Sequence, residues 1–113
     1  MPQHHGIQVY EILEKGNVLN GICTRTDGNP KSHYGIDNEI AIKQTPDDRG
    51  VEGKYNCRFM QSSGDPKIID CTVEINFVGS VYECRWYDDN KVHFTGIGLM
   101  MDNKYLAVSY IDA

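Results

Sequence analysis

The second half of the chain alternates apolar and polar residues between closely spaced turn signals, and this pattern limits the fold more than any other feature. The turn signals fall at residues 62–66, 79–80, 89–90 and 102–103, where Gly, Ser, Asp, Asn and Pro gather. Strands separated by such turns at short intervals form antiparallel hairpins that continue one another. No segment carries a helical apolar period of sufficient length. We therefore predict an up-and-down antiparallel sheet or barrel.

A hairpin centred on Gly64 is supported by the charges that it pairs. Segments 53–61 and 67–78 then face each other in these pairs: Arg58 with Asp70, Lys54 with Glu74, and Cys57 with Cys71. Opposite charges directly across a ladder each stabilise it by roughly 0.2–1 kcal/mol. The turn at 79–80 extends the register, and it sets the following pairs: Glu74 with Arg85 outside, and Val73 with Trp86, Ile75 with Cys84 and Phe77 with Tyr82 inside.

The last two turns, taken as two-residue turns, carry the same inward face through the remaining strands. The expected pairs are Trp86 with His93, Cys84 with Thr95, Tyr82 with Ile97, Leu99 with Leu106, Ile97 with Val108, and Thr95 with Tyr110. In this register, Trp86, His93, Thr95 and Tyr110 share one face of adjacent strands.

The first half is less regular, but it completes the strand count. Segments 7–14 and 17–25 form an expected hairpin about Lys15-Gly16, whose inward face the sequence leaves open. Segment 36–44 is a further strand with an Ile40 and Ile42 alternation, and 27–34 and 45–50 are loops. The 113 residues therefore form one all-β domain, 1–113, with about eight strands. A barrel of that size encloses its own side chains or one small ligand.

Four short segments carry a resemblance to known families. They are residues 53–55, 81–86, 96–99 and 106–110, with sequences Gly-Lys-Tyr, Val-Tyr-Glu-Cys-Arg-Trp, Gly-Ile-Gly-Leu and Leu-Ala-Val-Ser-Tyr. With the strand count, they resemble a group of small bacterial β-barrel proteins of unknown function and the calycin barrels, meaning lipocalins, fatty-acid-binding proteins and avidins. The resemblance implies a calycin-like barrel and carries no active site. The lipocalin Gly-x-Trp signature is absent and a single Trp does not match the avidin set, so neither retinoid nor biotin binding is carried over.

Composition excludes several classes of partner. A net charge of −5 with scattered Lys and Arg argues against nucleic-acid binding, which needs a basic patch. No apolar run approaches the ~20 residues of a membrane helix. The N-terminus has no apolar stretch typical of a signal peptide, so we expect a cytoplasmic location by default and leave secretion open.

The four cysteines are too widely spaced for a zinc motif, and three occupy apolar positions of alternating strands. We expect reduced thiols that pack as small hydrophobes. The alternative is one disulfide between Cys57 and Cys71, which the predicted hairpin places opposite each other, and their redox state stays open.

The shared inward face suggests a small pocket. Aromatic walls with a few hydrogen-bonding groups are typical of ligand sites, so we expect the barrel mouth to bind a small apolar or amphipathic molecule through four residues: Trp86, His93, Thr95 and Tyr110. The alternative is a filled barrel that acts as a structural or interaction module, through a homo-oligomer or another partner. Catalysis is least favoured, because no carboxylate on the same face orients His93 and an apolar setting suppresses the thiolate of Cys84. No catalytic residue, metal ligand or cofactor is assigned, and the sequence names neither ligand nor pathway.

Overall fold

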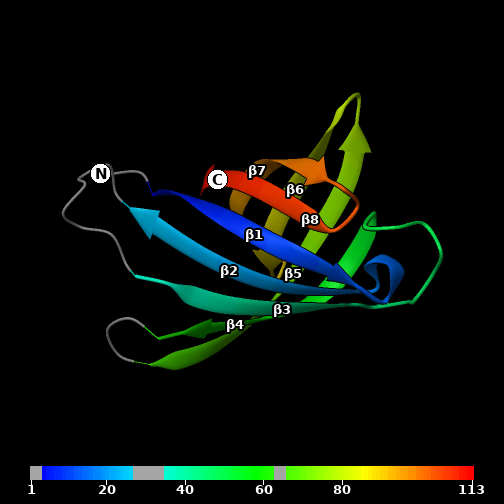
Figure 1. The fold of residues 1–113 in the computed structure, drawn as a ribbon. Helices are drawn as coiled ribbons and strands as arrows, with labels where there is room; N and C mark the ends of the chain where they lie inside the picture. Colours follow the sequence, from blue (N-terminus) through cyan, green and yellow to red (C-terminus); the bar gives the residue numbers. More distant parts are fainter. Residues whose placement is uncertain (1–3, 27–34, 63–65) are drawn as a thin grey trace.

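The protein is a closed antiparallel β-barrel in which each strand pairs with the next and the last pairs with the first (Figure 1). The structure, a computed structural model, describes residues 4–26, 35–62 and 66–113. Its strands are β1 (His5–Leu13), β2 (Val18–Thr26), β3 (Asp37–Lys43), β4 (Gly53–Gln61), β5 (Lys67–Val78), β6 (Val81–Asp88), β7 (Lys91–Met101) and β8 (Tyr105–Asp112). A 3₁₀ helix, η1 (Glu14–Gly16), connects β1 to β2. The predicted eight-stranded up-and-down barrel is confirmed, and among the described residues no helix is long and apolar enough to cross a membrane.

The predicted register of β4, β5 and β6 is confirmed, but Phe77, expected inside opposite Tyr82, is 50% exposed. Cys57 lies opposite Cys71, and the Arg58 and Asp70 side chains form an exposed ion pair at 2.9 Å. Across the 79–80 turn, Glu74 faces Arg85 and Val73 faces Trp86. The centre of the first turn, residues 63–65, and the predicted loop 27–34 lie outside the described residues.

The predicted register between β6 and β7 is wrong, because β7 contains a bulge. The 89–90 turn itself forms as expected, since Asp88 pairs with Lys91. The register then shifts, so that Trp86 pairs with Phe94 instead of His93. A bulge sets two residues of one strand against one of the other, and every later β7 residue therefore faces the side opposite to the prediction.

The predicted register between β7 and β8 is also wrong, because the turn between them has three residues. Met101 pairs with Tyr105, which leaves 102–104 as the turn. The second shift offsets the first, so β8 turns its expected face inward while β7 does not. Ile97 and Leu99 are 60% and 64% exposed, and the inward positions belong to Gly96 and Gly98. A Cβ on Gly96 would lie 2.6 Å from the Ser109 carbonyl oxygen. The close packing of β7 against β8 therefore requires a residue without a side chain at this position.

The N-terminal strands turn polar side chains inward. β1 buries Gln8 and Tyr10, whereas Ile7 on its outer face is 58% exposed. In β3 the usual pattern is inverted: Asp37, Glu39 and Lys43 are buried, while Ile40 is half-buried and Ile42 is exposed.

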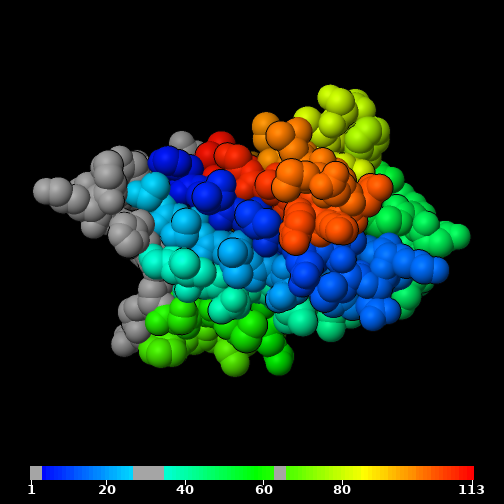
Figure 2. Space-filling model, in the orientation of Figure 1, coloured from blue at the N-terminus to red at the C-terminus, as the bar shows by residue number. Residues whose placement is uncertain are grey.

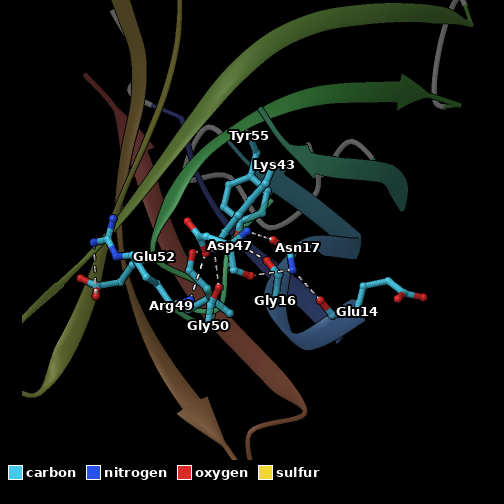
Figure 3. Close-up of polar contacts among 10 residues, drawn as sticks. Glu14, Gly16, Asn17, Lys43, Asp47, Arg49, Gly50, Glu52 and Tyr55 are labelled. Atoms are coloured by element: carbon cyan, nitrogen blue, oxygen red, sulfur yellow. Dashed lines mark hydrogen bonds and ion pairs between the residues drawn. The ribbon is translucent and has the colours of Figure 1, made fainter. Parts of the chain in front are cut away.

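One end of the barrel is closed by hydrogen bonds around Lys43 and Tyr55 (Figure 3). The Lys43 side chain is 1% exposed, and its ammonium donates to the Asp47 carboxylate and the Gly50 carbonyl. The Tyr55 hydroxyl lies 2.7 Å from the carbonyl oxygens of both Gly16 and Val51. These contacts tie η1 and the loop between β3 and β4 across the interior, so that end is filled by the chain itself.

Candidate functional site

The other end of the barrel contains a cavity of about 270 Å³ to which all eight strands contribute side chains. Tyr110, near the end of β8, is one of its lining residues, and Figure 1 shows this end of β8 beside the C-terminus. The apolar wall of the cavity consists mainly of aromatic rings. Its polar residues include an inner pair, Gln8 and Glu39, and an outer pair, Asp88 and His93, besides Thr24, Arg25 and Asp37. An apolar pocket with a few convergent polar groups is the usual form of a small-molecule site.

The aromatic wall is built around Tyr110. Its ring centroid lies 5.4 Å from Trp86 at a tilted angle and 5.4 Å from Phe94 edge-on. Its hydroxyl donates to the Thr24 carbonyl oxygen at 3.3 Å. Gly6 allows this placement, because a Cβ there would lie 2.7 Å from the Tyr110 ring. These contacts hold the rings of Trp86, Phe94 and Tyr110 in place around the cavity.

Glu39 is a buried ionisable group of the cavity wall. Its Oε2 accepts a hydrogen bond from the Tyr10 hydroxyl and another from Trp86 Nε1 at 3.3 Å. Burial raises the pKa of the Glu39 carboxyl above its ordinary value, although hydrogen bonds from Tyr10, Cys57 and Trp86 act in the opposite direction. A carboxyl whose pKa is raised by burial keeps its proton to a higher pH. A protonated carboxyl both donates and accepts a hydrogen bond.

The Gln8 amide lies against Gly21, which has no side chain to exclude it. Gly21 is the cross-strand neighbour of Tyr10 on one side and of Glu39 on the other. A Cβ on Gly21 would collide with Gln8 Nε2, so the amide occupies the space that a side chain would take. Gln8 is 2% exposed, and its Nε2 has no hydrogen-bond partner among the described residues. A buried donor without a partner is costly and rare.

The outer pair of polar residues lies at the mouth. His93 Nε2 lies 2.8 Å from an Asp88 carboxylate oxygen, and both side chains are 40% or more exposed. Sequence reasoning found no carboxylate that could orient His93, because it did not place Asp88 on this side. The bulge is what turns His93 to the mouth, beside the last residue of β6.

The structure brings together three of the four residues predicted to bind a ligand. Trp86 and Tyr110 form the wall, and His93 lies at the mouth instead of inside. Thr95 is not part of the cavity, because it pairs with Arg85 and Ile111 on the outer face of β7. Its predicted inward position is wrong because the bulge shifts the register of β7 by one residue, as it does for the later residues of this strand.

The prediction omitted the inner polar pair and Phe94. The alternation in 36–44 distinguishes the two faces of β3. It gives no reason why the face with Asp37, Glu39 and Lys43 should be buried and the face with Ile40 and Ile42 should point outward. The available signal was Gly21, whose missing side chain makes room on the adjacent strand.

The cysteine thiols lie in or behind the cavity wall and are all free. Burial raises the pKa of Cys23 and of Cys84 to about 12. A hydrogen bond with Cys71, together with burial, raises the pKa of Cys57 well above its ordinary range. Such thiols are protonated at neutral pH and are poor nucleophiles.

The chain matches no family model, no curated protein and no solved structure at a significant level. Within residues 4–26, 35–62 and 66–113, no three His, Cys, Asp or Glu side chains gather in an arrangement that could hold a metal ion.

Proposed function

We propose that the barrel binds a small amphipathic molecule in the cavity between Trp86, Tyr110 and the Gln8–Glu39 pair. The observation that carries this proposal is Gln8, which lines the aromatic-walled cavity and whose buried Nε2 has no hydrogen-bond partner among the described residues. A filled core places apolar groups at such a position or satisfies the amide internally. A ligand with a polar end would satisfy it here.

The size of the cavity limits the ligand. An apolar cavity of about 150 Å³ holds one benzene ring, so 270 Å³ accommodates about two fused rings. A long fatty acid does not fit, because Lys43 and Tyr55 fill the opposite end of the interior. The ligand is therefore small and compact, which agrees with the expected calycin-like barrel that encloses one molecule.

The raised pKa of the Cys23 and Cys84 thiols and the exposed position of His93 favour binding over catalysis. Cys23 and Cys84 are held protonated, and His93 lies at the exposed mouth. The proposed role is therefore that of a carrier or sensor, without a reaction of its own.

A ligand screen with a blocked cavity tests the proposal. Decanoate, biotin and a set of one- and two-ring aromatic amphiphiles are titrated by isothermal calorimetry. Ile69→Phe enlarges a residue of the cavity wall, and Ile68→Phe makes the same change at its exposed neighbour. We expect wild type and Ile68→Phe to bind an aromatic amphiphile and Ile69→Phe to bind it at least tenfold more weakly. If the two variants bind equally, the cavity is not the site.

A second candidate function is self-association through the outer face of β7, β8, β1 and β2. Figure 2 shows β8, β1 and β2 side by side on the face turned to the viewer. Large exposed apolar side chains on these four strands include Ile7, Ile22, Ile97, Leu99, Met101, Tyr105 and Ile111. Over 7–13, 18–24, 95–101 and 105–111, Glu11 is the only outward Asp, Glu, Lys or Arg. The outer faces of β4, β5 and β6, in contrast, carry Lys54, Arg58, Asp70, Glu74, Glu83 and Arg85.

The occupant of this face is a second copy of the chain. Two copies that each carry a net charge of −5 repel least where neither presents charges, and an uncharged apolar face can pair with itself about a two-fold axis. Sedimentation of Leu99→Lys and Ile68→Lys tests this, since both residues are 64% exposed but only Leu99 lies on the face. We expect a dimer for wild type and Ile68→Lys, and a monomer for Leu99→Lys. A wild-type monomer at high concentration would contradict this function.

A further inference from the structure

Two groups at the inner end of the cavity can each both donate and accept a hydrogen bond. The Gln8 amide fills the space beside Gly21, which pairs with Glu39 on β3. A carboxamide has an N–H₂ donor beside a carbonyl acceptor, and a protonated carboxyl has an O–H beside a carbonyl. When Glu39 is protonated, the inner end presents this pair of functions at both residues.

The contacts within the described residues leave the Gln8 amide N–H₂ unused. Glu39 Oε2 already accepts from Tyr10 and Trp86, which fixes the carboxyl in place. Gln8 Nε2 is buried with no partner among the described residues. A ligand atom that only accepts would satisfy the amide N–H₂ and leave the amide carbonyl without a donor. A ligand edge with an acceptor next to a donor satisfies both.

The walls set the shape and charge of the rest of the ligand. Trp86, Phe94 and Tyr110 surround the space with ring faces and edges, which suits a flat aromatic molecule. The Arg25 guanidinium lies 5.9 Å over the Phe94 ring centroid, and it is the one Lys or Arg among the described residues that line the cavity. Asp37 and Asp88 also line it, so the cavity has no net excess of positive charge. It therefore favours a neutral ligand over an anion.

We propose that the cavity selects a neutral, flat heteroaromatic ligand whose polar edge is of the lactam type, with N–H next to C=O. Gln8 is the residue that recognises this edge by hydrogen bonding. The proposal rests on the binding function proposed above and specifies its ligand class. The edge forms two parallel hydrogen bonds with the Gln8 carboxamide while the ring lies against Trp86 and Tyr110.

Four two-ring probes of nearly equal size separate the parts of this proposal. 2-Quinolinone carries the complete lactam edge, and 1-methyl-2-quinolinone has the acceptor with the donor blocked. Quinoline has an acceptor alone, and naphthalene has no polar edge. Each is titrated into the protein by isothermal calorimetry, with Trp86 fluorescence as a second readout. We expect 2-quinolinone to bind at least tenfold more tightly than each of the other three.

Substitution of Gln8 tests whether this residue carries the preference. Gln8→Met keeps the length of the side chain and removes its polar atoms, and removal of an unpaired buried amide should not lower the unfolding midpoint. We expect Gln8→Met to bind all four probes with affinities within about threefold of one another. The control Gln44→Met changes an exposed glutamine at the opposite end of the barrel and should keep the preference. Gly21→Ala, which pushes on the Gln8 amide, should reduce it.

The outcomes separate the two proposals. If the wild type binds all four probes with similar affinity, the lactam selection is wrong and the binding function stands. If Gln8→Met retains the preference, another residue reads the edge and the role of Gln8 is wrong. If none of the four probes binds, and the aromatic amphiphiles tested with Ile69→Phe also fail, the binding function itself is overturned.

Discussion

Replacing Glu39 by glutamine should remove a loss of stability that the wild-type protein undergoes as the pH rises. Burial raises the pKa of Glu39 above its ordinary value of 4.5, against the hydrogen bonds from Tyr10, Cys57 and Trp86. Between 4.5 and the raised pKa, the folded protein keeps a proton that the unfolded chain has released. The free energy of unfolding therefore falls as the pH rises through this window, by at most about 1.4 kcal/mol per pH unit for one proton. The stability that the protonated carboxyl provides is complete below pH 4.5 and is lost by the folded-state pKa.

The glutamine variant lacks this proton but keeps the contacts. Its carbonyl oxygen can accept from Tyr10 and Trp86, as Glu39 Oε2 does. Urea unfolding at pH 4.5, 5.5, 6.5 and 7.5 gives the free energy of unfolding of both proteins. The difference in favour of Glu39→Gln should grow with pH from its value at pH 4.5. Glu11→Gln makes the same change on the outer face of β1 and should leave the wild-type dependence unaltered.

Other titrating groups near the cavity do not obscure this comparison. Burial raises the pKa of four neighbours, so they stay neutral over the range: Tyr10, Cys23, Cys84 and Tyr110. The remaining ionisable groups that line the cavity occur in both proteins: Arg25, Asp37, Cys71, Asp88 and His93. A difference between Glu39→Gln and wild type that is constant from pH 4.5 to 7.5 would refute the buried, proton-holding carboxyl.

Three further predictions concern the closed end, β7 and the thiols. Tyr55→Phe should lower the free energy of unfolding by about 1–3 kcal/mol, since it leaves buried carbonyl groups without their donor; an unchanged urea midpoint would show that this end is not held by the hydroxyl. Gly96→Ala should destabilise by about 1–3 kcal/mol through overpacking, whereas Ile97→Ala, at an exposed position, should cost less than about 1 kcal/mol; the reverse order in urea unfolding would restore the register without a bulge. Thiol titration of the denatured, unreduced protein should find all four cysteines, and two missing thiols would indicate a disulfide between Cys57 and Cys71.

Local patterns were sufficient for the part of the fold in which turn type and strand pairing agree. The 79–80 turn has two residues, and the opposite charges of Glu74 and Arg85 support the same register, so β5 and β6 were predicted pair by pair. The bulge at His93 and the third residue of the 102–104 turn leave no such mark in the sequence, because the residues of β7 alternate through the bulge without interruption. Each shifts the register by one residue, and a shift of one residue exchanges the faces of a strand.

The candidate site depended on the choice between faces, which is why only part of it was predicted. Trp86 and Tyr110 lie on strands whose inward faces were assigned correctly, and both line the cavity. Thr95 lies on β7 and was assigned to the wrong face. Glu39 was missed because burial of a charged face over isoleucines depends on its partners Tyr10 and Trp86, which come from strands distant in sequence.

A high-resolution crystal structure of the protein grown with 2-quinolinone tests the central claim most directly. We expect Glu39 inside the barrel with Tyr10 and Trp86, and planar density in the cavity with its polar edge against Gln8. Side chains that fill the cavity, or a β3 strand with Ile40 and Ile42 inside and Glu39 in solvent, would contradict the claim that this end of the barrel is a binding site.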